Sequence, residues 1–521
     1  MRVIPAGLSV KRVKTSLTAS LVVIWLGGNM ISLPKSSIIL LSRADLAAKA
    51  PQKQARRFIG LPEVNTISVQ NTSTLSMPIT VTFALTNGTV ISQVFDTLLP
   101  ESFGIYVEPP NFVGTGRVEG LTDSLDDFNV FGVNFELSDK GNTAYLGLRY
   151  EEPGTIASTQ LHHFSPASVA FNQFLPLVDQ TSGWRTEFVL QNASLSNANL
   201  VVSVYNQEGI SVGNYFGVLA AKGSLAFDSL PIDVSTIPGV TSNFIGSIVV
   251  SADQFLTVAS SVHLSNGGLG LSTSYPVVND GGFSRSLVAP ALFKASDLQT
   301  SRLCVQNIGE VNASVNVAYS DGQTGFNTIH ADATYCFDQG TEAHASGWSG
   351  GAIISSTQPL VGVVDVFASD SANKTVGRWT YTLPAAADLD QKTVALPVLF
   401  NNYRQFNSAV HLFNPGTTAA VVSRRYTAFA DGFVFCPLPI TLPPNSYVAL
   451  SQSEALAFID VSMGYITSTQ PIAAVVSMKS SKTLGTTQRN LGYQAAYPRA
   501  PVALQKPCNP AYSAYLPLVR R

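Results

Sequence analysis

Charged residues are scarce in this 521-residue chain: Asp, Glu, Lys and Arg make up 12% of it, against about 25% in typical soluble domains. Ser, Thr, Asn, Val and Gly are abundant instead. These β-branched and small polar residues favour strands and turns over long helices, so the composition predicts an all-β protein. Seven basic residues and one acid fall within residues 1–50. The remainder is mildly acidic without basic clusters, which argues against nucleic acid as a partner.

The motifs of common catalytic and cofactor sites are missing from the sequence. It contains no His-Glu-x-x-His, no Gly-x-Ser-x-Gly nucleophile elbow and no phosphate loop. The adjacent His162 and His163 would point to opposite faces of a strand, so they could not chelate one metal ion together. We therefore expect no enzymatic activity and no cofactor.

One acidic stretch, 123–127, is a weak candidate for a cation site. Its carboxylates are Asp123, Asp126 and Asp127. Calcium binds roughly six to eight hard oxygens, usually on alternating residues of a loop that contains glycine. The stretch lacks both the alternation and a following glycine, so a solvated turn is the favoured interpretation and a calcium site the alternative.

After the N-terminus, no stretch of the sequence is long and apolar enough to predict a membrane span. At the N-terminus, basic residues at 11–14 precede an apolar run at 17–26 and small residues at 47–50, which is typical of an export signal. Pro51 is unfavourable after the best cleavage site, at Ala50. Residues 1–50 are therefore predicted to be a signal peptide or an uncleaved anchor, with a linker at 51–57. Membrane contact is expected only if the segment stays uncleaved.

The chain has four cysteines, and none shows Cys-x-x-Cys spacing. Export would place them in an oxidising compartment, where structural disulfides form. The simplest of the three pairings joins Cys304 to Cys336 and Cys436 to Cys508. Four buried free thiols are the alternative.

A Leu-Pro phrase recurs along the chain. Its copies are Phe174-Leu175-Pro176-Leu177-Val178, the looser Ala289-Pro290-Ala291-Leu292-Phe293, Ala395-Leu396-Pro397-Val398-Leu399, and Tyr515-Leu516-Pro517-Leu518-Val519 just before the last two residues. A strand ending in Asn recurs too, at Asn71, Asn192, Asn307 and Asn414. These asparagines are 121, 115 and 107 residues apart, which indicates a module repeated about every 110 residues.

Each Asn is followed by a polar turn, an alternating strand and a glycine turn, a succession that predicts a hairpin. A third recurring segment is centred on Gln254, Gln358 and Gln470, with apolar runs on both sides. It predicts a second hairpin with a Gln-Pro-type turn at its tip.

About seven short strands per period predict tandem antiparallel β-sandwich domains of immunoglobulin or fibronectin type III character. The predicted boundaries are a divergent domain at 58–170, further domains at 171–283, 284–390 and 391–498, and a tail at 499–521. Each unit could bury its own core, and short linkers favour a semi-rigid rod of domains on a string.

The Leu-Pro phrase, the Gln-Asn strand end and the Thr-Gln-Pro segment resemble tandem repeats in secreted, largely uncharacterised proteins of certain filamentous environmental bacteria. Those proteins often end in a Tyr-Leu-Pro-Leu-Val-type tail with a basic residue, as residues 515–521 do here. The resemblance covers most of residues 171–521 and, more weakly, 58–170. It implies an extracellular or cell-surface location, and no enzymatic activity.

These features predict a non-catalytic extracellular protein with a structural, adhesive or surface-layer role. Its expected partner is a cell-envelope glycan or another copy of itself. A carbohydrate-binding array is the alternative, with a secreted hydrolase third. Trp184, Trp348 and Trp379 could stack on sugars, but they do not recur at equivalent repeat positions, so packing is the favoured role. The sequon residues Asn71 and Asn192 are expected to serve turn geometry.

The closing phrase is interpreted as the start strand of a fifth module. Three fates are open for Tyr515, Leu516, Pro517, Leu518 and Val519. They could fold back on an open edge of the last domain, held close by a Cys436–Cys508 disulfide. They could be donated to a neighbouring molecule, or they could be read as a sorting signal.

Overall fold

The computed structural model divides the chain into two compact units, Met1–Pro51 and Gln52–Arg521. The residues that it describes are 11–14, 20–23, 64–71, 76–85, 87, 89–99, 103–107, 114–120, 128–137, 157–164, 170–192, 194–221, 224–225, 232–266, 269–279, 283–369, 371, 375–402, 406–428, 434–452, 461–480 and 490–494.

In the first unit, β1 (Lys11–Lys14) pairs antiparallel with β2 (Ser20–Val23). The basic stretch thus forms one strand, and the middle of the apolar run forms the other. None of the helices within the described ranges is long and apolar enough to cross a membrane. Signal peptide and anchor remain alternative predictions for residues 1–50.

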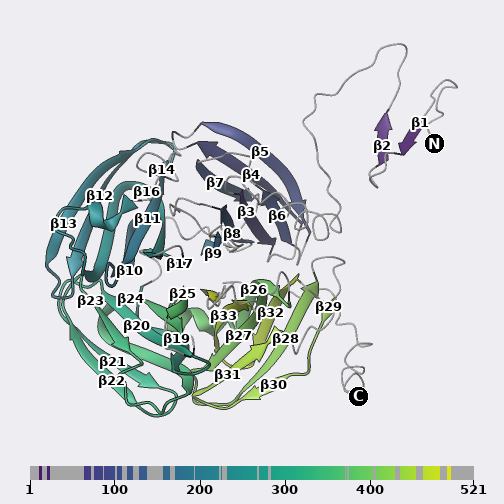
Figure 1. Ribbon diagram of the computed structural model, residues 1–521. Helices are drawn as coiled ribbons and strands as arrows, with labels where there is room; N and C mark the ends of the chain where they lie inside the picture. Colours follow the sequence, from purple (N-terminus) through teal and green to yellow (C-terminus); the bar gives the residue numbers. More distant parts are fainter. Residues whose placement is uncertain are drawn as a thin grey trace. The chain divides into compact units, whose positions relative to one another are not determined.

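The second unit is built from antiparallel strands, which confirms the all-β prediction (Figure 1). Among the described residues they are accompanied by two short 3-10 helices, η2 (Val234–Thr236) and η3 (Ala386–Gln391). The strands fall into four groups that follow the repeat, and we call these groups modules 1 to 4.

Module 1 contains β3 (Val64–Asn71), β4 (Met77–Leu85), β5 (Val90–Leu98), β6 (Phe103–Val107), β7 (Gly114–Gly120), β8 (Phe128–Leu137) and β9 (Ala157–Phe164). Module 2 contains β10 (Ala170–Asp179), β11 (Trp184–Asn192), β12 (Ala198–Asn206), β13 (Ser211–Leu219), β14 (Ser224–Leu225), β15 (Ile232–Asp233), β16 (Ile245–Asn266), β17 (Leu269–Pro276) and β18 (Val278–Asn279). Module 3 contains β19 (Ser284–Lys294), β20 (Gln299–Asn307), β21 (Ala313–Tyr319), β22 (Thr324–Ile329), β23 (Thr334–Asp338), β24 (Trp348–Ser369) and β25 (Thr375–Thr382). Module 4 contains β26 (Thr393–Phe400), β27 (Phe406–Asn414), β28 (Ala420–Ala428), β29 (Val434–Phe435), β30 (Ile440–Leu442), β31 (Ser446–Ser451), β32 (Val461–Ser468), β33 (Ala473–Ser480) and β34 (Asn490–Gln494).

Module 4 shows the two-sheet plan most simply. One sheet has the order β26-β32-β28-β29, with β30 also on β28, and the other has the order β31-β27-β33-β34. Leu396 and Val422 of the first sheet share a buried core with Leu412 and Val476 of the second. Alternating apolar residues thus fill the space between two sheets, as the period-2 pattern predicts.

In modules 2 and 3, one long strand runs through both sheet layers and joins them into a single hydrogen-bonded sheet. β16 and β24 are each 22 residues long. The first part of β24, around residues 352–356, pairs with β21, and its second part, 360–368, pairs with β20. The segment around Gln358 lies between these two parts.

The predicted Gln-Pro hairpin is therefore wrong, because the chain does not reverse direction there. In module 4 the two apolar runs form β32 and β33, which belong to different sheets. The predicted hairpin after the Asn is present in modules 1, 2 and 3, but it forms across the glycine turn and not between the strand that ends in Asn and the next strand. β11 pairs with β14, β15 and β16, whereas β12 pairs with β13 across the glycine turn at Gly209. The φ angle of Gly209 is +76°, a backbone conformation that favours glycine.

The Leu-Pro phrase opens modules 2, 3 and 4 as strands β10, β19 and β26. These strands pair with β16, β24 and β32. In each pair the register shifts across the proline, between Leu175 and Val178 in module 2, for example. Proline lacks an N–H for the ladder, and a bulge is one of the few places where a strand tolerates it.

The recurring asparagines are buried and bind backbone. Asn307 Nδ2 donates to the carbonyl oxygens of Val311, Ile329 and His330 at 2.8, 3.1 and 3.1 Å, and its Oδ1 accepts from the Gly309 N–H at 2.9 Å. The equivalent amides of Asn71, Asn192 and Asn414 also bind two consecutive carbonyls at the end of a later strand. The predicted role in turn geometry is confirmed for Asn192, which binds the Ser196 carbonyl at 2.7 Å and the Ser194 N–H at 2.9 Å. The amide of Asn71 binds the carbonyls of Leu98 and Leu99, 27 and 28 residues further along the chain.

Replacing Asn307 with Ala should destabilise the protein by about 1–3 kcal/mol, because buried carbonyls lose their donor. Urea unfolding followed by tryptophan fluorescence would measure this, since Trp348 and Trp379 belong to module 3. Asn316→Ala, at an exposed position of the same module, should change stability by less than about 0.5 kcal/mol. Equal effects of the two variants would contradict the structural role.

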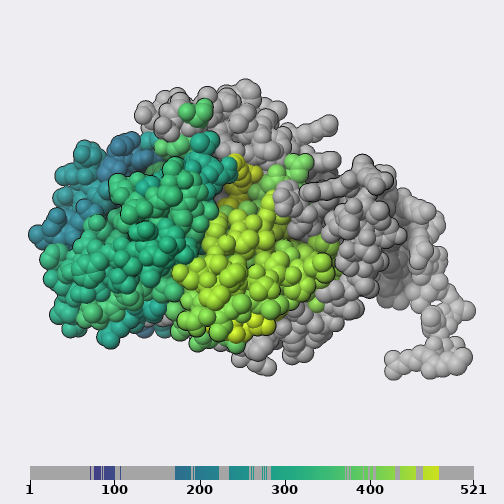
Figure 2. All heavy atoms as spheres, turned by 90° about the horizontal axis from the view of Figure 1, so that it is seen from below, coloured from purple at the N-terminus to yellow at the C-terminus, as the bar shows by residue number. Residues whose placement is uncertain are grey.

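Neighbouring modules share buried contacts, which a string of independent domains would not need. β9 contacts β17, β17 contacts β25, β25 contacts β34, and β34 contacts β9. Phe413 and Ala473 of module 4 pack with Val288 and Leu389 in one buried cluster. Atoms of modules 3 and 4 form one continuous surface in Figure 2. The expectation of independent cores is therefore corrected, because apolar side chains also face the neighbouring module.

Candidate functional site

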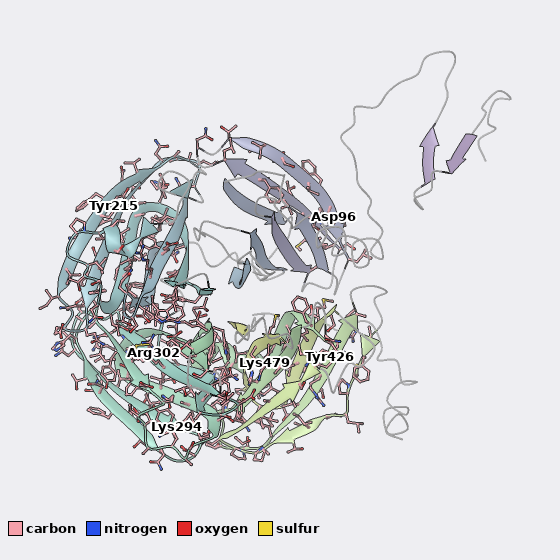
Figure 3. All side chains as sticks on the ribbon, viewed as in Figure 1. Asp96, Tyr215, Lys294, Arg302, Tyr426 and Lys479 are labelled. Carbon is pink, nitrogen blue, oxygen red and sulfur yellow. A yellow bond between two sulfur atoms is a disulfide. The ribbon has the colours of Figure 1, made fainter. Side chains whose placement is uncertain are left out.

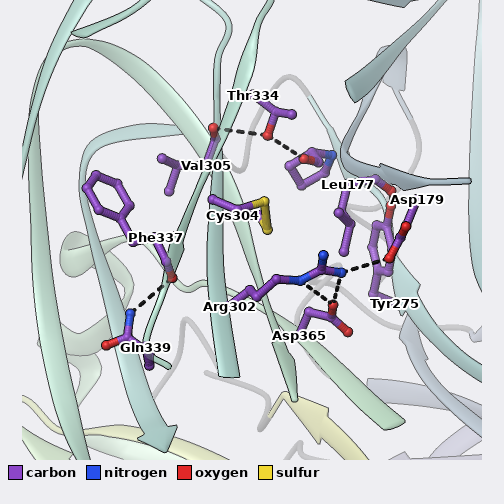
Figure 4. Close-up of a disulfide and its surroundings, with 12 residues drawn as sticks. Leu177, Asp179, Tyr275, Arg302, Cys304, Val305, Thr334, Phe337, Gln339 and Asp365 are labelled. Carbon is purple, nitrogen blue, oxygen red and sulfur yellow. Dashed lines mark hydrogen bonds and ion pairs between the residues drawn. A yellow bond between two sulfur atoms is a disulfide. The ribbon is translucent and has the colours of Figure 1, made fainter. Parts of the chain in front are cut away.

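Four charged side chains meet where modules 2 and 3 touch. Arg302 Nη2 lies 2.8 Å from Asp179 Oδ2 and 2.6 Å from Asp365 Oδ2 (Figure 4). Arg378 Nη2 lies 3.0 Å from Asp179 Oδ2, and its Nε lies 2.7 Å from Asp365 Oδ1. Asp179, Asp365 and Arg378 are at most 1% exposed. We call these four residues the ionic cluster.

The ionic cluster is balanced in charge and enclosed by aromatic rings. The Arg378 guanidinium lies 4.2 Å from the ring centre of Trp184 and 4.8 Å from that of Phe367. Burial by itself would raise the pKa of Asp179, but the charges of Arg378 and Arg302 outweigh it and lower that pKa to about 2. Two anions thus neutralise two cations across a module boundary, an arrangement suited to holding modules together.

The predicted disulfide between Cys304 and Cys336 is confirmed. The two cysteines lie opposite each other on β20 and β23. Cys304 packs in a buried cluster with Leu177 and Tyr275 of module 2. The disulfide therefore borders the same module contact as the ionic cluster. Cys436 is also disulfide-bonded, but its predicted partner, Cys508, lies outside the described residues.

His411 lies between two hydroxyl groups, an arrangement that resembles a nucleophile–base pair. Its Nε2 lies 2.7 Å from Ser477 Oγ, and its Nδ1 lies 2.7 Å from the Tyr447 hydroxyl. Burial lowers the pKa of His411 to about 4, so the imidazole is neutral at pH 7. A catalytic triad orients its histidine with a carboxylate, whereas a phenol binds Nδ1 here. The ring packs edge-on against Phe293 of module 3, at 5.7 Å between centres, which supports a packing role.

His344 is buried and polar in a similar way. Its Nδ1 lies 2.7 Å from Asp321 Oδ2 and its Nε2 lies 2.9 Å from Gln339 Oε1. The ring stacks on Trp348 with 3.8 Å between ring centres. Trp184 and Trp379 are 7% and 1% exposed, so the favoured packing role of the three tryptophans agrees with their surroundings.

The weak calcium candidates, Asp123, Asp126 and Asp127, lie outside the described residues. Residues 515–519 lie outside them as well. The part of the chain that the structure describes contains no group of three His, Cys, Asp or Glu side chains that could hold a metal ion. His162 and His163 occupy consecutive positions of β9.

A repeated exposed aromatic is the feature that sequence reasoning missed. Phe95, Phe216 and Phe326 are 74%, 72% and 68% exposed. Each stands three residues before a residue whose carbonyl accepts from the recurring asparagine: Leu98, Leu219 and Ile329. The three phenylalanines are therefore structurally equivalent. Aligning the repeats on that carbonyl would have found them.

These phenylalanines lie on β5, β13 and β22, the terminal strands in the sheet orders of modules 1, 2 and 3 (Figure 1). Figure 3 labels the neighbouring residues Asp96 and Tyr215 on the same strands. Edge strands carry unpaired backbone N–H and C=O groups in addition to their side chains. A large apolar side chain beside such groups can supply both contact area and hydrogen bonds to a partner. We call Phe95, Phe216 and Phe326 the edge phenylalanines.

Module 4 departs from this pattern. Pro439 stands three residues before Leu442, the carbonyl of which binds Asn414. The adjacent Leu438 is 77% exposed. An apolar side chain therefore remains exposed near this position of module 4, but an aromatic ring does not occupy it.

No protein family matches the chain, and the curated proteins contain no similar sequence. Among solved structures, the crystal structure of Thermotoga maritima 1070 is similar to a part of it, at 10% identity. The match covers 21% of this chain and 95% of that one, with a TM-score of 0.18.

Proposed function

We propose that the protein is a non-catalytic extracellular or cell-surface protein with an adhesive or surface-layer role. The observation that carries the proposal is the edge phenylalanines, three exposed rings at one equivalent position of successive modules. Single exposed apolar residues are common on protein surfaces, but an equivalent one in three modules suits a partner that is itself repetitive. Several weak contacts on one chain multiply, because each bound module raises the effective concentration of the next.

An extracellular location is supported by the disulfide between Cys304 and Cys336, since structural disulfides persist in oxidising compartments. The export-type N-terminus and the resemblance to secreted repeat proteins support it as well. Lack of activity against hydrolase substrates is part of the proposal. The partner is a cell-envelope glycan or a second copy of the chain.

We also propose an architecture of immunoglobulin or fibronectin type III character for each module, based on two antiparallel sheets that share one core. The strand order differs from that of immunoglobulin constant domains, in which the first two strands are neighbours in one sheet. In module 4 the first strand, β26, pairs with β32 instead. The likeness therefore concerns layers and not connectivity.

Replacing the edge phenylalanines with serine (F95S/F216S/F326S) should reduce binding of the purified protein to isolated cell envelopes at least tenfold. Loss of three contacts in one chain removes their combined avidity. The midpoint of thermal unfolding should not change, because the three side chains are exposed. A co-sedimentation assay over a range of protein concentrations measures the effect.

The matched control replaces Leu195, Val311 and Leu298, also exposed, with serine. It should bind as the wild type does. Unchanged binding of the phenylalanine variant would refute the proposal. Competition by soluble envelope polysaccharide would identify a cell-envelope glycan as the partner, and loss of self-association would identify a second copy of the chain.

A further inference from the structure

Modules 2, 3 and 4 begin with the same strand in the same place. β10, β19 and β26 each pair with the strand that also pairs with β12, β21 or β28. We call β10, β19 and β26 start strands. Each contains the Leu-Pro phrase. Each pairs with one edge of its partner strand, and β12, β21 or β28 pairs with the opposite edge.

Module 1 has a counterpart for each of the other main strands of module 2. β3 corresponds to β11, β4 to β12, β5 to β13, and β7 and β8 to the two parts of β16. The register supports the last correspondence: Ile79 pairs with Gly120 and Leu85 with Gly114, as Leu200 pairs with Ala252 and Asn206 with Gly246. The sheet is β5-β4-β7, and among the described strands none pairs with the second edge of β7.

The sequence just before module 1 is too short to supply a start strand. In modules 2, 3 and 4 the proline of the phrase stands 16 or 17 residues before the recurring asparagine, which leaves room for the start strand, a turn and the next strand. Leu61-Pro62 stands only nine residues before Asn71. β3 already begins at Val64.

We propose that the C-terminal segment Tyr515–Val519 is the start strand of module 1 and pairs with β7. It is the fourth copy of the phrase, and the three described copies all pair with the strand that corresponds to β7. Of the four modules in the described residues, modules 2, 3 and 4 have a described start strand, and the assignment gives the fourth copy of the phrase to module 1.

The three described start strands predict the register. The residue before the proline, or its equivalent, pairs as Leu175 with Ile248, Ala289 with Ala352 and Leu396 with Gly464. These partners correspond to Gly116 of β7. After the bulge, Val178 pairs with Gly246, which corresponds to Gly114. We therefore place Leu516 opposite Gly116 and Val519 opposite Gly114.

The C-terminal chain is long enough to reach β7. Pro176, Pro290 and Pro397 follow the ends of β9, β17 and β25 of the preceding modules by 12, 14 and 15 residues. Pro517 follows the end of β34 by 23 residues. Each described start strand joins the module that contacts the named strand before it. β10 follows β9 and joins the module of β17, which contacts β9; β19 follows β17 and joins the module of β25; β26 follows β25 and joins the module of β34. β34 contacts β9 in the same way, so the corresponding module is module 1.

A second contact supports this choice of neighbour. The Tyr465 hydroxyl of module 4 lies 3.5 Å from the carbonyl oxygen of Asn71 in module 1. Ile353, which corresponds to Tyr465, packs against the cluster that contains Phe413, the residue before Asn414. Module 4 thus contacts module 1 as module 3 contacts module 4.

Paired cysteines test the pairing and its register in the full chain. L516C/G116C should form a disulfide on mild oxidation, detected by mass spectrometry of the linked peptides. L516C/A449C has its second cysteine on β31, a terminal strand of module 4, and should not form one. A linked peptide from the second pair alone would overturn the proposal in favour of fold-back on module 4. V519C/G114C repeats the test where G116C perturbs folding.

Hydrogen exchange provides a readout without cysteines. Removing residues 512–521 should speed amide exchange at 114–120 at least tenfold and leave β22 of module 3 unchanged. Equal exchange at 114–120 in both chains would overturn the proposal. Mixing L516C chains with G116C chains tests donation between copies: a linked dimer, together with no link within the double variant, would show that a second copy supplies the strand.

Discussion

Arg378→Met is expected to destabilise the protein by about 3–5 kcal/mol, the range for breaking a buried ion pair by removing one partner. Methionine keeps an apolar stem against Trp184 but leaves Asp179 and Asp365 with Arg302 as their remaining cation from the ionic cluster. Both carboxylates are buried, so the surplus negative charge cannot be solvated. Urea unfolding with fluorescence detection measures the loss, because Trp184 lies next to the removed guanidinium.

Arg285→Met is the matched control, since Arg285 is exposed on β19 of the same module. It should cost less than about 0.5 kcal/mol. Adding Asp179→Asn to Arg378→Met should recover part of the loss, because it removes one surplus charge. A loss below 1 kcal/mol for Arg378→Met would contradict the assigned role of the ionic cluster.

His411 is expected to make the protein sensitive to mild acid. Its pKa is lowered by burial to about 4, whereas an unfolded histidine titrates near 6.5. Between these values the unfolded chain binds the proton first, so stability falls as pH falls from 6.5 to 4. The difference amounts to about 3 kcal/mol by linkage.

His411→Gln should flatten this part of the pH profile, whatever it costs in stability at pH 7. Urea midpoints measured between pH 7 and pH 4 test this, with His330→Gln as the exposed control. Parallel profiles for the wild type and His411→Gln would contradict the assignment. Asp179 affects stability in a separate pH range. Because its pKa is lowered to about 2 in the folded protein, its ionised form stabilises the fold above pH 4, and this stabilisation is lost as the pH falls towards 2.

The sequence predicted the features that depend on local pattern. The strand class follows from composition, and the module period from the recurring Asn, because each module needs that buried amide in the same place. The pairing of Cys304 with Cys336 followed from their shared module. Proline was expected at an edge, and its actual place in a bulge rests on the same missing N–H.

The hairpins were mispredicted because apolar runs and turn residues do not reveal which sheet a strand joins. The run around Gln358 continues into the second sheet instead of turning back. The ionic cluster left no local signal either, since Asp179 and Arg378 are 199 residues apart. The edge phenylalanines were hidden by spacing: Leu98 follows its asparagine by 27 residues and Ile329 by 22.

The 22-residue strands of modules 2 and 3 have a mechanical consequence. Because β24 is hydrogen-bonded in both sheets, neither sheet can detach without loosening the strand that anchors the other. Tension along β24 would load the ladders of both sheets in shear, so many hydrogen bonds would resist together instead of opening one at a time. In module 4 the corresponding strands are separate, and its two sheets can yield in sequence. Under a pulling force, modules 2 and 3 would therefore hold as single mechanical elements.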